Sequence, residues 1–124
     1  MSHNVGIWID HKTAVIVSAS EDRVTTKTLE SEVGPHSPQD GGGEKRSEER
    51  YGRHLDRYYD EVIRQMGKPE GLFIFGPGEA KLQLKERLSH SKALPERPVG
   101  IETADKLTDP QIVAKVKEHY GIDR

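Results

Sequence analysis

The feature that most constrains the fold is an uninterrupted apolar run, Gly71-Leu72-Phe73-Ile74-Phe75, with a tight turn, Gly76-Pro77-Gly78, directly after it. A strand without polar residues is typical of a sheet that is covered on both faces. Residues 79–88 follow as a predicted helix whose apolar residues are Ala80, Leu82, Leu84 and Leu88. Strand, tight turn and helix form half of a β-α-β unit, so the sequence predicts an α/β fold.

Three further strands are predicted before residue 34. Val5 to Ile9 and Thr13 to Ser18 are short β-rich runs on either side of the polar turn Asp10-His11-Lys12, which is the pattern of a hairpin. Arg23 to Val33 follows, with apolar and threonine side chains alternating against polar ones, as in a more exposed antiparallel strand. The sheet is therefore expected to begin as a meander.

The remainder of the chain predicts two helices and a last strand. Glu44 to Met66 is expected to be a long helix that ends at Gly67, because its apolar residues recur every three or four positions: Tyr51, Leu55, Tyr58, Tyr59, Val62, Ile63 and Met66. Arg97 to Ala104 is expected to be a strand, and Thr108-Asp109-Pro110 is expected to cap a final helix. The predicted order is β-β-β-α-β-α-β-α, a mixed sheet of about five strands flanked by helices. A length of 124 residues suits one domain over 1–124, with an exposed loop at 34–43.

The order of these elements resembles a known family. The chain is similar to the central domain of the eukaryotic and archaeal class I peptide-chain release factors and of the rescue protein Pelota. Two features carry this resemblance besides the element order: the glycine-rich loop 34–43 before a charged helix, and Gly76-Pro77-Gly78 with Lys81 after the buried strand. The chain resembles most the stand-alone bacterial proteins built on that domain. The resemblance spans nearly the whole chain and implies a ribonuclease H-like sheet.

The resemblance also implies a catalytic segment at Gly41, Gly42 and Gly43. In the release factors a Gly-Gly-Gln loop helps water to cleave the ester between the nascent peptide and tRNA. Glycines let the backbone approach the tRNA terminus closely, and a backbone N–H can stabilise the oxyanion. Here Gly43 stands where the glutamine is expected, so the side-chain amide is missing while the N–H remains. On composition alone, the three glycines also suit a flexible linker.

A basic stripe is the second candidate feature. Arg46, Arg50, Arg53 and Arg57 recur at helical spacing, and Lys45 lies beside them, so these side chains could bind RNA phosphates. They alternate with Glu44, Glu48, Glu49 and Asp56, which also suits a solvated, ion-paired helix face. The net charge of −2 gives no general attraction to nucleic acid.

Other chemistries find less support. Gly76-Pro77-Gly78 could bind phosphate at a helix start, but it lacks the spacing of a P-loop and suits a tight turn. Asp10, with Asp60 and Asp105, could form a ribonuclease H-type metal site, yet Asp10 also suits a turn. The six histidines lack ligand spacing, so no metal and no cofactor is expected.

The sequence therefore predicts a ribosome- or tRNA-associated factor of translation or ribosome rescue, with peptidyl-tRNA ester hydrolysis left open by Gly43. The alternative is a non-catalytic protein-interaction module on the same fold. The chain has no cysteine and no apolar segment of membrane-spanning length, so we expect a cytoplasmic protein that contacts neither membrane nor DNA.

Overall fold

The computed structural model describes residues 4–20, 23–31, 56–91, 95 and 99–121, and the expected glycine loop and the first half of the long helix lie outside them. Five strands form one sheet: β1 (Asn4–Ile9), β2 (Thr13–Ala19), β3 (Val24–Glu30), β4 (Gly71–Gly76) and β5 (Gly100–Thr103). Their order across the sheet is β3-β2-β1-β4-β5. The first three strands pair antiparallel, and β4 pairs parallel to both β1 and β5. The predicted α/β fold with a mixed sheet is confirmed.

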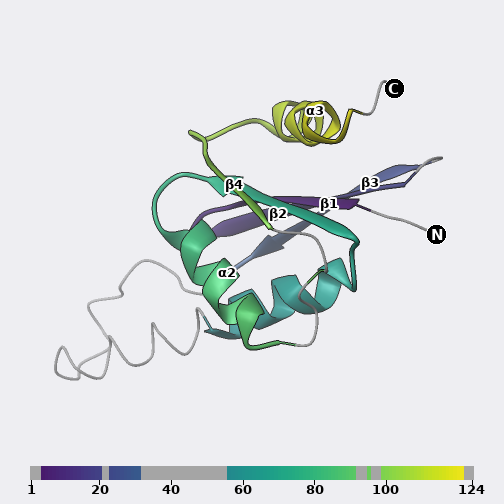
Figure 1. Cartoon of the computed structure of the whole chain (residues 1–124). Helices are drawn as coiled ribbons and strands as arrows, with labels where there is room; N and C mark the ends of the chain where they lie inside the picture. Colours follow the sequence, from purple (N-terminus) through teal and green to yellow (C-terminus); the bar gives the residue numbers. More distant parts are fainter. Residues whose placement is uncertain (1–3, 21–22, 32–55, 92–94, 96–98, 122–124) are drawn as a thin grey trace, which may run out of the picture.

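Side-chain alternation along β1, β2 and β4 gives the sheet two apolar faces. Ile7 of β1 is opposite Ile16 and Ile74, while the next residue, Trp8, is opposite Val15 and Phe75 on the other face. Helices cover both faces, which makes three layers (Figure 1). Burial of a large aliphatic or aromatic side chain contributes about 1.5–3 kcal/mol, so these central strands supply much of the stability of the fold.

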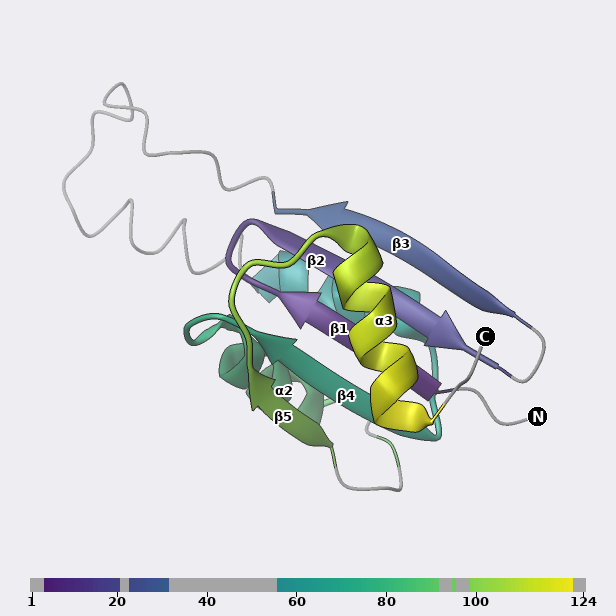
Figure 2. The same ribbon diagram turned by 90° about the horizontal axis from the view of Figure 1, so that it is seen from above.

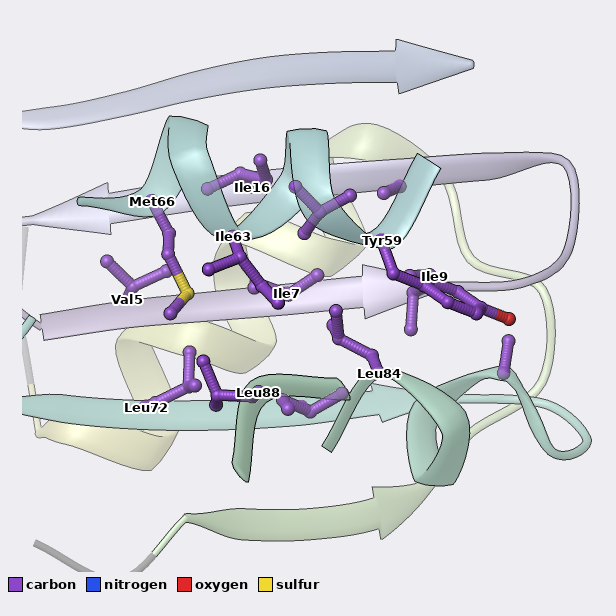
Figure 3. Close-up of a cluster of buried hydrophobic side chains, with 14 of the residues drawn as sticks. Val5, Ile7, Ile9, Ile16, Tyr59, Ile63, Met66, Leu72, Leu84 and Leu88 are labelled. Atoms are coloured by element: carbon purple, nitrogen blue, oxygen red, sulfur yellow. The ribbon is translucent and has the colours of Figure 1, made fainter. Parts of the chain in front are cut away.

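One face is covered by two helices. Residues 56–66 are helical, and α2 (Ala80–Ser89) lies beside them (Figure 1). Figure 3 shows side chains of both helices meeting those of β1 and β4, with Ile63 and Met66 above β1 and Leu84 and Leu88 above β4. The apolar stripe expected at Tyr58, Tyr59, Val62, Ile63 and Met66 is buried, as predicted.

The other face is covered by α3 (Asp109–Tyr120), which crosses the sheet over β1 (Figure 2). Thr108 caps this helix in a capping box with Gln111, as the sequence predicted. Gly121 ends the helix in the left-handed conformation. Ile112 and Val116 are buried against Trp8, Val15, Val17, Phe73 and Phe75.

Several boundaries differ from those expected. The third strand occupies Val24–Glu30 and the last occupies Gly100–Thr103 within the described residues. Ala104 follows the last strand and still donates its N–H to the carbonyl of Gly76 in β4. Glu79 caps α2 and is not part of it. Leu82 points outward and is 53% exposed, whereas the neighbouring Lys81 is buried.

Candidate functional site

The candidate site is the edge of the sheet at which the parallel strands β1, β4 and β5 end. Trp8 pairs with Phe75, and Gly76 pairs with Thr103, so the three carboxyl ends lie together. In open α/β sheets, ligands bind outside the carboxyl ends of the strands. The turn between β1 and β2 and the start of α2 are at the same edge (Figure 2).

Both described residues that border the 32–55 segment also belong to this edge. Ser31 follows β3, and it donates its N–H to Lys12 O at 2.8 Å and its hydroxyl to His11 O at 2.7 Å. Asp56 opens the described part of the helix, two residues before Tyr58, whose hydroxyl donates to Asp10 O at 3.1 Å. The segment between these two points lies outside the described residues. It contains the expected catalytic residues Gly41, Gly42 and Gly43 and the expected basic residues Lys45, Arg46, Arg50 and Arg53.

Asp10 forms the turn after β1. Its Oδ1 accepts the backbone N–H of Lys12 at 2.8 Å and that of Thr13 at 2.6 Å, which is the turn-forming arrangement considered for this residue. Asp60 instead binds Arg87, and Asp105 uses its carbonyl to accept the Trp8 Nε1–H. Among the residues that the structure describes, no three histidines or carboxylates come together as metal ligands.

Two adjacent tyrosines hold the helix against this edge. Burial, and after it the charge of Asp10, raises the pKa of Tyr58 well above its usual range, so the hydroxyl stays a neutral donor to Asp10 O. Tyr59 is 3% exposed, and its hydroxyl donates to Gln83 Oε1 at 2.6 Å. The same Gln83 oxygen lies 3.1 Å from His11 Nε2. Gln83 therefore joins α2, the 56–66 helix and the β1–β2 turn.

Arg57 is the member of the expected basic stripe that the structure describes. It is exposed, and it has no ion-pair partner within the described ranges. Arg64, seven residues later and therefore on the same helix face, is paired with Glu61 at 2.6 Å. A guanidinium without an ion-pair partner among the described residues can donate to a phosphate oxygen, and no ion pair with a described residue has to be broken first.

The Gly76-Pro77-Gly78 turn closes the edge between β4 and α2. Gly76 has φ +151° and Gly78 has φ +64°, conformations that favour glycine. Lys81, 6% exposed, donates from Nζ to Gly78 O and so holds the turn against the first turn of α2. The segment forms the tight strand-to-helix turn considered for it.

Gln83 and His11 were not singled out in the sequence. They are 72 residues apart and belong to different elements, so no local pattern connects them. The one available signal is that Gln83 and Arg87 are one helical turn apart, beside the apolar stripe of α2, where side chains reach a neighbouring helix.

No helix within the described ranges is long and apolar enough to cross a membrane. Neither a protein-family profile nor a curated protein matches the sequence.

Solved structures do match the fold. The chain is similar to Pelota from Archaeoglobus fulgidus, with a TM-score of 0.54 and 11% identity over 95% of this chain and 35% of Pelota. It also matches an archaeal translation termination factor, aRF1, with a TM-score of 0.49 and 15% identity over 97% of this chain and 40% of that factor. The chain thus has a Pelota-like fold, and it spans less than half the length of either protein.

Proposed function

We propose that this chain is a ribosome- or tRNA-associated factor of translation or ribosome rescue. The observation that carries the proposal is the position of Ser31 and Asp56, which border the glycine segment at the carboxyl edge of a Pelota-like sheet. The family resemblance assigns to this segment the part that enters the peptidyl-transferase centre. Arg57, exposed next to Asp56, supplies a phosphate contact at the base of the segment.

The reaction to be tested is hydrolysis of the peptidyl-tRNA ester. Water attacks the ester carbonyl, the bond to the ribose oxygen breaks, the peptide leaves with a carboxyl group and the ribose hydroxyl takes up a proton. In the proposed site the backbone N–H of Gly43 would stabilise the oxyanion. Nothing at position 43 can orient the attacking water through a side-chain amide, so the reaction of the native chain is expected to be slow.

Co-sedimentation with purified ribosomes tests the association. Binding that weakens as salt rises is the expected result, since phosphate contacts release counterions. Sedimentation no greater than that of a bovine albumin control, at low as well as physiological salt, would reject the proposal.

Variants of the glycine segment test the chemistry. If the native chain hydrolyses peptidyl-tRNA, deletion of residues 41–43 should abolish the activity while ribosome binding persists. Hydrolysis that survives the deletion would mean that the reaction is carried out elsewhere in the chain.

The second candidate function is a non-catalytic interaction module, and Gly43 in place of glutamine is the observation that favours it. Gly43→Gln separates the two readings. A gain of hydrolysis in this variant indicates a disabled release-type site, whereas no effect of the substitution in any assay favours a module that binds a protein partner or a second copy of the chain.

A further inference from the structure

We propose that Gln83 is a positioning residue, which fixes the end of the 56–66 helix that carries Asp56 and Arg57 relative to the β1–β2 turn. This inference deepens the proposed function and rests on it for its biological meaning. Its structural part rests on contacts among described residues alone.

One side-chain oxygen of Gln83 lies between the other two elements of the edge. Gln83 Oε1 accepts the Tyr59 hydroxyl at 2.6 Å and lies 3.1 Å from His11 Nε2. It accepts a second hydrogen bond in the tautomer of His11 that carries its proton on Nε2. An amide oxygen has two lone pairs and can accept both hydrogen bonds. The oxygen is the point at which three elements of the edge meet.

This contact lies near one end of the described part of the 56–66 helix. Tyr59 is the fourth described residue of the helix, close to its junction with the 32–55 segment. Tyr58, one residue earlier, is bonded to Asp10 O at the same turn. Arg87, one turn beyond Gln83 in α2, donates to Asp60 at 2.7 Å. Two side chains of α2, Gln83 and Arg87, therefore bind adjacent residues of the 56–66 helix.

The two contacts that α2 makes with the 56–66 helix differ in their exposure to water. The Arg87–Asp60 pair is 40% and 55% exposed and is weakened by water and salt. The Tyr59 side chain is 3% exposed, so water competes little for its hydrogen bond to Gln83. Gln83 is therefore the contact whose loss should most loosen this end of the helix.

Amide hydrogen exchange of the full chain tests the positioning role. Gln83→Leu, similar in size but without an acceptor, should accelerate exchange at residues 56–62 roughly tenfold, while β1 and β4 keep their protection. Gln83→Glu keeps acceptor oxygens at the same place and should retain slow exchange. Gln65→Leu is the matched control, because it also removes a carboxamide, but one that lies in the 56–66 helix itself, at the end far from Tyr59.

His11→Ala, in the native chain and in Gln83→Glu, tests the same contact even if Gln83→Leu is poorly folded. His11→Ala should accelerate exchange at residues 56–62 in the native chain but add little in the Gln83→Leu background, because both remove the same hydrogen bond. In the Gln83→Glu background, where the contact persists, His11→Ala should act as it does in the native chain.

Unchanged exchange in Gln83→Leu, or equal acceleration at residues 56–62 in Gln65→Leu, would overturn the positioning role. Ribosome co-sedimentation then separates this inference from the proposed function. Gln83→Leu should bind several-fold more weakly than the native chain and Gln65→Leu should bind equally well. No binding by the native chain would overturn the proposed function, and the exchange result would still decide the role of Gln83.

Discussion

Gly76 illustrates how one residue makes the candidate edge. At its φ of +151°, an added Cβ would lie 2.2 Å from the carbonyl oxygen of Ile9, which belongs to the neighbouring strand β1. Backbone cannot yield as the end of a flexible side chain can. The turn from β4 to α2 therefore passes so close to β1 that a side chain is excluded at this position.

We expect Gly76→Ala to destabilise the fold by roughly 3 kcal/mol, since strain in φ and a backbone clash add together. Urea denaturation measures the change. Gly78→Ala is the control: φ is +64°, but nothing lies within 4 Å of the added Cβ, so a loss of about 1–2 kcal/mol is expected. Equal losses in the two variants would contradict the close approach at Ile9.

At the scale of elements, α3 packs closely on β1 because Gly6 has no side chain. A Cβ on Gly6 would lie 2.3 Å from Val116 Cγ2, and Val116 is fully buried. The helix approaches the sheet closely at this point because β1 carries glycine opposite a branched residue. The depth at which α3 packs thus depends on this pair.

The pair predicts non-additive stability. Gly6→Ala should cost about 2 kcal/mol by overpacking, and Val116→Ala about 2 kcal/mol by leaving a cavity. The double variant should cost at least about 1 kcal/mol less than the sum, because the alanine methyl at position 6 occupies the space that Val116 vacates. Urea denaturation of the four proteins measures this coupling, and simple addition of the two losses would refute the contact.

The contact between α2 and the 56–66 helix should depend on pH. The hydrogen bond from Arg87, and secondarily its charge, lowers the pKa of Asp60 below the ordinary 3.8. A carboxyl group whose pKa is lower in the folded state stabilises the fold above the unfolded pKa, and this contribution disappears as the pH falls through the folded value. Exposure of both side chains limits it to at most about 1 kcal/mol.

Arg87→Met should therefore be less stable than the native chain at pH 7 and approach it as the pH falls below 3.8. Thermal or urea unfolding at several pH values measures the difference. Lys85→Met, a basic residue on the same helix with no ion pair among the described residues, should show no such trend. A constant difference for Arg87→Met at all pH values would mean that packing of the stem, and not the ion pair, is what the substitution removes.

At the scale of the whole molecule, the sequence predicted element types better than contacts. The apolar run at Leu72–Phe75 and the glycines after it specify a buried strand and a turn locally, and both are present. Asp10 also acts locally, through residues two and three positions on. Gln83, Tyr59 and His11 come from three distant segments, so their shared oxygen follows only from the packed fold.

The same distinction explains Lys81 and Leu82. Helical periodicity gives each position a face, but which face is covered depends on the neighbouring layers. Here the 56–66 helix and the sheet enclose α2 on the side of Ala80, Leu84 and Leu88, and Lys81 shares that burial while Leu82 does not. The aliphatic stem of a lysine can pack along an apolar surface, so Lys81 can be buried on this side of α2.

As a ribosome ligand, the molecule should bind with the end that carries Arg57. Arg57 is exposed and unpaired within the described residues, next to the 32–55 segment, whereas Lys68 is exposed beyond the opposite end of the same helix. If this end enters the ribosome, Arg57→Glu should weaken co-sedimentation and lower the slope of log affinity against log salt by about 1, the value for one lost phosphate contact. Lys68→Glu makes the same change in net charge and should leave that slope unaltered. Equal effects of the two variants would indicate attraction to RNA by overall charge, without insertion of the end that carries Arg57.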